Sequence, residues 1–243
     1  MALRAILFDL DGTLRHSVPN GFNTFTAILH DLGWPLDAEC LRAGERWTHF
    51  YWSIAPEMIQ DLEELGADTP AFWSRYARRQ IEVLGLGEHS EQLVDEVNRL
   101  MGERYKPVDR VPDDVRPTLL GLRARGLKLA LVSNRSEPLA PVAEALGLAD
   151  LFELTVSAGE LGSWKPAPEI FWMALERIGV APEEAVYVGD NYHADVEGAR
   201  NAGLTPVLID PRGLFGEPGC AVIATIGALP EALSLALHTT PAG

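Results

Sequence analysis

Hydrophobic residues follow two different rhythms along the chain. Residues 2–8 form a short apolar run, which predicts a buried strand. Between residues 22 and about 105 the apolar positions recur at helical spacing, as in "FNTFTAILHDLG" and "EQLVDEVNRLMGERY", and no convincing strand is found. The segments "RHSVPNG" and "KPVDRVPDD", residues 15–21 and 106–114, are rich in turn-forming residues and are interpreted as linkers on either side of this helical stretch.

After the second linker, predicted helices and strands alternate. The predicted strands are "LKLALVSN", "FELTVSAGE", "EAVYVGD", "TPVLID" and "CAVIATIG", and amphipathic helical segments precede, separate and follow them. Such alternation indicates right-handed crossovers and a doubly wound parallel α/β sheet with helices on both faces. We therefore expect two domains: an α/β core made of residues 1–15 and 110–243, and an all-helical domain of residues 16–109 inserted within it.

Composition and charge narrow the class of protein. The 243 residues are 47% hydrophobic and 23% charged, as in an ordinary soluble protein, and the formal net charge is −15. Such acidity argues against nucleic acid as the main partner, although a local cationic pocket can still attract a small anion. Cys40 and Cys220 have neither zinc-site nor disulfide-framework spacing. With no signal peptide or membrane span recognised in the sequence, we expect a cytoplasmic protein.

Polar residues gather where the predicted strands end. In open parallel sheets, ligands bind at the carboxyl ends of the strands. The residues that the predicted strand ends and one loop bring to this edge are Asp9, Asp11, Ser133, Asn134, Lys165, Asp190 and Asp195. Several carboxylates, one hydroxyl, one amide and one ammonium at a single edge predict a site for an anionic ligand and a metal cation.

Four segments carry a family resemblance. "DLDGTL", "LVSN", "WKPAPEIF" and "VGDNYHAD" resemble, in order, the four motifs of the haloacid dehalogenase-like hydrolases, and among them the phosphatases. The helical insert after the first motif resembles the C1 cap of the phosphoglycolate phosphatase-like branch. The resemblance implies a Rossmann-like core, a Mg²⁺ cofactor, an aspartyl-phosphate intermediate and a small phosphorylated metabolite as the substrate.

The two aspartates of "DLDGTL" take different expected roles. Asp9 and Asp190 offer hard oxygen ligands for Mg²⁺, and Asp9 is also the expected nucleophile. By resemblance, Asp11 gives the metal only its backbone carbonyl, so its side chain serves as general acid and then as general base. For the first of these roles Asp11 must start protonated, a form that the neighbouring carboxylates favour.

Four further residues complete the expected site, and a fifth, His16, is an open candidate. Lys165 and the Ser133 hydroxyl are expected to bind the transferring phosphoryl oxygens, and backbone N–H groups near Leu10, Asp11 and Asn134 are expected to add donors. Asp195 is expected to orient Lys165 or a metal-bound water without binding the metal itself. His16 stands where the family often has an acidic residue, so a role in substrate choice and simple exposure to solvent both stay open.

Several alternatives also stay open. The aromatic run "RWTHFYW", residues 46–52, fits a helical core better than a substrate lid, and "RYARRQ", residues 75–80, fits a solvated helix face. A phosphosugar mutase would use the same four motifs. A non-catalytic interaction module would be expected to have lost one of the site residues, and none is missing. The physiological substrate and the oligomeric state do not follow from the sequence.

Overall fold

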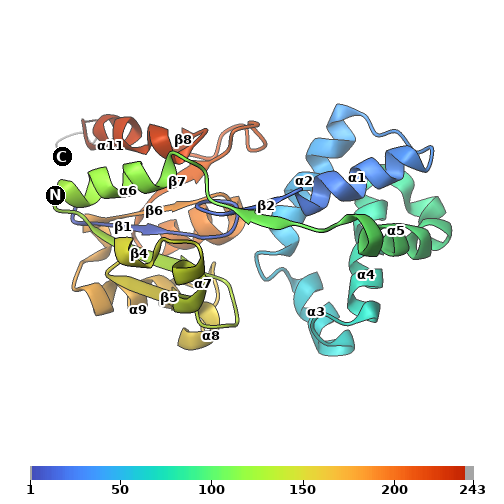
Figure 1. Ribbon diagram of the computed structural model, residues 1–243, viewed down its shortest axis with the longest axis horizontal. Helices are drawn as coiled ribbons and strands as arrows, with labels where there is room; N and C mark the ends of the chain where they lie inside the picture. Colours follow the sequence, from blue (N-terminus) through green and yellow to red (C-terminus); the bar gives the residue numbers. More distant parts are fainter. Residues whose placement is uncertain (1, 239–243) are drawn as a thin grey trace. The chain divides into compact units, whose positions relative to one another are not determined.

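The computed structural model describes residues 2–238 of the chain and contains two compact units (Figure 1). The α/β unit comprises Met1–His16 and Asp109–Gly243, and the helical unit comprises Ser17–Val108. Because the helical unit is one continuous stretch, it interrupts the α/β unit at a single place in the sequence, shortly after the first strand.

The α/β unit is built on a six-stranded parallel sheet. Its spatial order is β5-β4-β1-β6-β7-β8. The strands are β1 (Ala5–Phe8), β4 (Lys128–Ser133), β5 (Leu154–Ser157), β6 (Ala185–Gly189), β7 (Thr205–Ile209) and β8 (Ala221–Ile223). The first strand therefore lies inside the sheet, paired in parallel with β4 on one side and β6 on the other.

Helices cover both faces of this sheet. Ile6 and Phe8 of β1 belong to one hydrophobic cluster, whereas Ala5 and Leu7 belong to the other, as expected from strand alternation. The first cluster includes residues of α6 (Val115–Ala124), α7 (Ala140–Ala145) and α11 (Leu229–His238); the second includes residues of α8 (Ala158–Leu161), α9 (Pro168–Ile178) and α10 (Gly198–Asn201). Figure 1 shows α6 and α11 on one side of the sheet and α9 on the other. The predicted doubly wound α/β class is confirmed.

The helical unit packs around its own core. Its helices are α1 (Gly21–Asp31), α2 (Ala38–Tyr51), α3 (Pro56–Leu65), α4 (Pro70–Ile81) and α5 (Ser90–Arg104). Side chains of Asn20, Asp37 and Thr69 cap α1, α2 and α4 by accepting hydrogen bonds from the first-turn N–H groups. Over residues 2–238, every helix is too short or too polar to cross a membrane.

A buried ion cluster joins α2, α3 and α4. Asp61 is completely buried and accepts hydrogen bonds from Arg79 at 2.8 and 2.9 Å and from the Tyr51 hydroxyl at 3.0 Å. Although burial alone would raise it, these donors bring the pKa of Asp61 below its ordinary value. Arg75 also reaches Asp61, at 3.4 Å. The expectation of a purely solvated face for residues 75–80 was therefore wrong, because two of its arginines neutralise a buried carboxylate.

The two predicted linkers contain strands. β2 (His16–Val18) and β3 (Val108–Arg110) form a separate two-stranded sheet, visible in Figure 1 where the chain passes between the units. All three residues of β3 are exposed, so the segment has no buried face and therefore no alternating hydrophobic pattern to reveal it.

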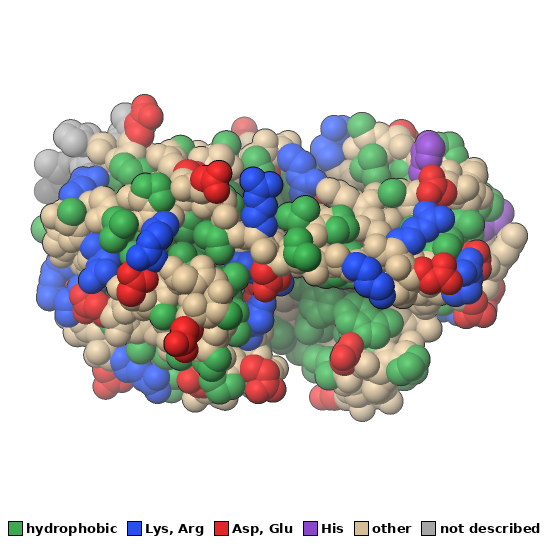
Figure 2. Space-filling view, viewed as in Figure 1, with side chains coloured by type: hydrophobic (Ala, Val, Ile, Leu, Met, Phe, Trp, Pro, Cys, Tyr) green, Lys and Arg blue, Asp and Glu red, His purple; other side chains and the backbone are tan. Residues whose placement is uncertain are grey.

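Charges of both signs are mixed on one face of the molecule. On the face drawn in Figure 2, Lys and Arg side chains are interspersed with Asp and Glu and form no continuous basic stripe.

Candidate active site

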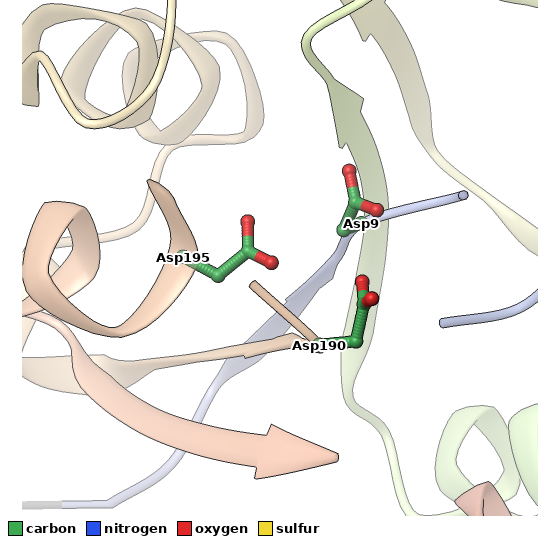
Figure 3. Close-up of side chains that lie close together, drawn as sticks. All are labelled: Asp9, Asp190 and Asp195. Atoms are coloured by element: carbon green, nitrogen blue, oxygen red, sulfur yellow. The ribbon is translucent and has the colours of Figure 1, made fainter. Parts of the chain in front are cut away.

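Three aspartates meet at the carboxyl edge of the parallel sheet. Asp9 follows β1, Asp190 follows β6, and Asp195 lies in the π-helical turn Tyr192–Glu197 that comes next. One carboxylate oxygen from each lies within 4.8 Å of the others, and Figure 3 shows the three side chains converging. Asp195, which was expected to orient Lys165 or a metal-bound water, thus belongs to the same carboxylate cluster as the expected metal ligands Asp9 and Asp190.

A buried lysine neutralises part of this cluster. The Lys165 side chain is 2% exposed, and its Nζ donates to Asp9 Oδ1 at 2.7 Å and to Asp195 Oδ1 at 2.6 Å. It also lies 2.8 Å from the Tyr187 hydroxyl, which in turn donates to the Val132 carbonyl. An ammonium has three donors, so these three oxygens satisfy it completely.

The cluster holds more negative than positive charge. With all three carboxylates ionised, one ammonium leaves two negative charges uncompensated in a site where Asp9 and Asp195 are buried and Asp190 is half-buried. Burial raises the pKa of Asp9 from 3.8 to about 7, an effect that Lys165 opposes and Asp195 reinforces. Burial, Asp195 and Asp9 also raise the pKa of Asp190 well above its ordinary value. Because hard carboxylate oxygens suit Mg²⁺, the donor set and its uncompensated charge fit a bound divalent cation.

Two glycines allow the carboxylates to approach. Gly12 has φ +85°, and a Cβ added there would lie 2.2 Å from Asp190 Oδ2. A Cβ on Gly189 would lie 2.2 Å from Asp195 Oδ2. Since real Cβ contacts never become so short, either side chain would push an aspartate out of the cluster.

The side chain of Asn134 holds the backbone of Lys165, whereas the expected contribution of Asn134 to phosphate binding is through backbone N–H. Its Oδ1 accepts a hydrogen bond from the Lys165 N–H at 2.7 Å, and its Nδ2 donates to the Lys165 carbonyl at 2.8 Å. The side-chain amide is therefore occupied in fixing the backbone that carries Lys165, rather than available to phosphate. Ser133 is buried at the end of β4, immediately before it.

Asp11 lies between two arginines that sequence reasoning missed. Arg135 binds both oxygens of its carboxylate, at 2.7 and 2.8 Å, and Arg15 donates to Oδ1 at 2.8 Å. The groups in direct contact with the Asp11 carboxylate are therefore guanidinium groups, and not only the carboxylates that the sequence indicated. Arg135 directly follows "LVSN" and Arg15 directly follows "DGTL", which is the only signal that the sequence contained.

His16 begins β2, next to Arg15, and is partly buried. Burial and the neighbouring Arg15 lower the pKa of its imidazole below 6.5, which favours the neutral ring. Neither of the two expected alternatives for His16 is decided by this placement.

A parallel α/β sheet with an acidic cluster and a buried lysine at its carboxyl edge agrees with the site expected of a hydrolase that uses an aspartate beside a divalent cation. The family model of haloacid dehalogenase-like hydrolases matches residues 3–203, and the chain belongs to that family.

Similar proteins agree with this assignment. The chain is 34% identical to a phosphoserine phosphatase of Thermus thermophilus, over 94% of this chain and 97% of that one. It is 33% identical to a phosphoglycolate phosphatase of Chromobacterium violaceum, over 85% of each. A solved structure of a 2-haloacid dehalogenase from Pseudomonas syringae has a TM-score of 0.55 and 27% identity, over 96% of this chain and 99% of that one. The expectation of a phosphatase within this family is confirmed.

Proposed function

We propose that the protein is a Mg²⁺-dependent phosphatase that hydrolyses the phosphomonoester of a small metabolite through an aspartyl-phosphate intermediate. The observation that carries the proposal is the position of Asp9. Its carboxylate is buried beside Lys165 and belongs to the acidic cluster with Asp190 and Asp195. The names of the similar curated proteins, phosphoserine phosphatase and phosphoglycolate phosphatase, support this class of substrate.

Asp9 and Asp190 would hold the cation, with the backbone carbonyl of Asp11 as a further ligand. When bound, Mg²⁺ supplies positive charge that lets an anionic nucleophile approach an anionic phosphoryl group. Asp195 accepts a hydrogen bond from the Asn191 N–H at 2.9 Å and binds Lys165, so its role is to fix the ammonium and the turn that follows β6.

In the first step an Asp9 oxygen attacks phosphorus and the bond from phosphorus to the leaving oxygen breaks. Lys165 would exchange one of its three present contacts for a transferring oxygen, and the Ser133 hydroxyl would bind another, where negative charge is spread in the transition state. Asp11, in its protonated form, gives its proton to the leaving oxygen, which departs as an alcohol.

In the second step water attacks the phosphorus of the Asp9 acyl phosphate. Asp11, now a carboxylate, takes the proton from this water, and the Asp9 carboxylate leaves. The products are inorganic phosphate and the enzyme in its starting state, with the proton back on Asp11. Proton and charge therefore balance over one cycle.

We assign the role of a cap to residues 16–109, on the ground that they are inserted after the first motif as in the phosphoglycolate phosphatase-like branch. A cap of this kind limits substrates by size and excludes bulk water during the chemistry. Cys40 and Cys220 are free thiols, which fits the cytoplasmic location that we propose for the enzyme.

The test is a panel of phosphomonoesters, with p-nitrophenyl phosphate as the generic member, assayed with Mg²⁺ and with EDTA. We expect Mg²⁺-dependent release of phosphate, and a loss of more than about a thousandfold in kcat for Asp9→Asn. Asp150→Asn, which removes a surface carboxylate paired with Arg116, is the matched control and should retain activity. Near wild-type turnover by Asp9→Asn would contradict the mechanism.

The same assay separates the phosphatase from its two alternatives. A phosphosugar mutase would hydrolyse its aspartyl phosphate slowly in water, so a long-lived acyl phosphate in the absence of sugar would favour it. A non-catalytic member would release no phosphate from any ester and would bind Mg²⁺ weakly. The comparisons favour neither, because the curated relatives named above are phosphatases.

A further inference from the structure

The hydroxyl group of Tyr187 is bound on two sides next to the candidate site. The Tyr187 side chain belongs to β6 and is completely buried, and its ring packs edge-to-face against Phe171 of α9 at 4.9 Å. The hydroxyl accepts a hydrogen bond from Lys165 Nζ at 2.8 Å and donates one to the Val132 carbonyl at 2.8 Å. Because a phenol has a single O–H donor and an ammonium only donates, the direction of both bonds is fixed.

This hydroxyl joins two strands that are not neighbours in the sheet. β1 lies between β4 and β6, and Leu7 of β1 is paired in register with Tyr187. Adjacent strands lie about 4.8 Å apart, so the contact of Tyr187 with Val132 bridges strands about 10 Å apart. The bonded carbonyl directly precedes Ser133, whose hydroxyl is expected to bind a transferring oxygen. Tyr187 therefore ties the end of β4 to the ammonium of Lys165.

The three acceptors around Lys165 Nζ differ in how firmly they are held. Tyr187 is fixed by its ring packing and by its second hydrogen bond. Asp195 is buried, and its other oxygen accepts a hydrogen bond from the Asn191 N–H at 2.9 Å. Asp9, in contrast, is the proposed nucleophile, so its carboxylate has to change partners when it attacks phosphorus.

A phosphoryl oxygen cannot take the place of the Tyr187 hydroxyl. Tyr187 belongs to the hydrophobic cluster that packs between the sheet and α8, α9 and α10. Entry of a charged oxygen into such a layer would cost more free energy than one hydrogen bond returns. Of the three N–H groups of Lys165, the one that now faces Asp9 is therefore the one that can turn to the substrate.

We propose that Tyr187 is a positioning residue for phosphoryl transfer, because its hydroxyl holds the Lys165 ammonium in place while another N–H of that ammonium passes from Asp9 to a transferring oxygen. The proposal rests on the phosphatase function proposed above and adds a residue that stands just before the fourth motif. Only a hydrogen bond is exchanged in this step. The N–H bonds of the ammonium stay intact, so no proton is transferred.

A neutral group suits this position. A third carboxylate would cancel more of the ammonium charge, whereas a hydroxyl satisfies one N–H and leaves the charge available to the transferring oxygens. Burial raises the pKa of Tyr187 well above its ordinary value, although Lys165 opposes this, so the hydroxyl keeps its proton. Without the hydroxyl, the Lys165 ammonium would have a buried N–H with no acceptor and more freedom to move.

The experiment is Tyr187→Phe, which keeps the ring and removes the hydroxyl. With p-nitrophenyl phosphate and saturating Mg²⁺ we expect kcat to fall about 10- to 100-fold, which corresponds to the loss of a hydrogen bond to a charged group. KM should change less than about threefold, because the alignment of Lys165 matters most where negative charge is spread in the transition state. The Mg²⁺ concentration that gives half-maximal activity should be nearly unchanged, since the hydroxyl binds Lys165 and Val132.

Tyr51→Phe is the matched control. Tyr51 is also completely buried, and its hydroxyl donates to Asp61 within the helical unit at 3.0 Å. Both substitutions should lower the free energy of unfolding in urea, but Tyr51→Phe should retain the wild-type kcat at a temperature where all variants are folded. If Tyr187→Phe also retained the wild-type kcat there, its hydroxyl would serve stability alone and the proposal would be overturned.

A crystal structure of the wild-type enzyme with Mg²⁺ and orthovanadate tests the exchange without any variant. Lys165 Nζ should stay within hydrogen-bond distance of the Tyr187 hydroxyl and of Asp195, with its third bond moved from Asp9 to a vanadate oxygen. An ammonium that had left the Tyr187 hydroxyl in this complex would overturn the positioning role and leave the phosphatase proposal standing. Failure of the wild-type enzyme to hydrolyse any ester would overturn both.

Discussion

The Nζ atom of Lys165 lies 2.7 Å from Asp9 Oδ1 and comes from a position 156 residues later in the chain. The same ammonium binds Asp195, which lies in the turn after β6. One positive charge is therefore shared between Asp9, the expected nucleophile, and the Asp195 carboxylate. Although burial alone would lower it, the neighbouring Asp195 and Asp9 raise the pKa of Lys165 well above its ordinary value. Lys165 therefore stays charged, and the arrangement of the site depends on it.

Replacing this lysine tests that dependence. Lys165→Met should lower the free energy of unfolding by about 3 kcal/mol or more, because removing one partner leaves buried carboxylates without their cation. Urea unfolding monitored by circular dichroism measures the change, and activity should be lost with it. Lys128→Met, at a lysine whose ion pair with Glu153 is exposed, is the matched control and should cost less than about 1 kcal/mol. If Lys165→Met and Lys128→Met lowered the free energy of unfolding by the same amount, the buried ion pairs of Lys165 would not be important for stability.

The raised pKa of Asp9 predicts a pH dependence for the metal-free protein. The folded state holds the Asp9 proton with a pKa of about 7, against 3.8 in the unfolded chain. A raised carboxyl pKa contributes stability that is fully present below 3.8 and is lost as the pH rises through 7. In EDTA, the free energy of unfolding of the wild-type protein should therefore fall relative to that of Asp9→Asn as the pH rises from about 4 to about 7.

Urea unfolding of both proteins across this range measures the difference. Added Mg²⁺ should reduce the loss, because a cation favours the ionised carboxylate. The difference in free energy of unfolding between the wild type and Asp9→Asn could instead stay constant with pH or change in the opposite direction. Either result would show that Asp9 does not titrate in this way.

A substitution at Gly12 tests whether the Asp190 carboxylate needs the space beside the Gly12 backbone. Gly12→Ala places a Cβ 2.2 Å from Asp190 Oδ2, which should displace that carboxylate and weaken Mg²⁺ binding by more than about 10-fold. The readout is the rise in melting temperature caused by Mg²⁺. Gly33→Ala is a close control, since Gly33 has φ +90° and no atom near its added Cβ. The control should lose some stability through backbone strain but retain the full response to Mg²⁺.

The fold could be predicted largely because its strands are buried. The apolar runs that became β1, β4 and β6 lie in the interior of the sheet, and such burial leaves a strong pattern in the sequence. The strands β2 and β3 were missed for the opposite reason, since three exposed or half-buried residues each carry no hydrophobic signal.

The residues of the candidate site that belong to sequence motifs could be predicted. Residues whose role depends on a contact with a segment far away in the sequence could not. Strand ends and the four motifs indicated Asp9, Asp190 and Lys165, and the structure brings their side chains together. Arg135 looks like any loop arginine until the fold places it against Asp11. The hydrogen bonds of the Asn134 amide to the Lys165 backbone likewise join segments about 30 residues apart, a pairing that one sequence cannot reveal.

The central place of β1 in the sheet sets an order for making the protein. β1 ends at residue 8 and leaves the ribosome before its partners β4 and β6, which begin only at residues 128 and 185. The intervening helical unit is continuous and has its own core, so it can fold before β1 is paired. The segment bearing Asp9 is therefore synthesised before its partners and set in place late, and a chain truncated before β6 would expose an unpaired apolar edge.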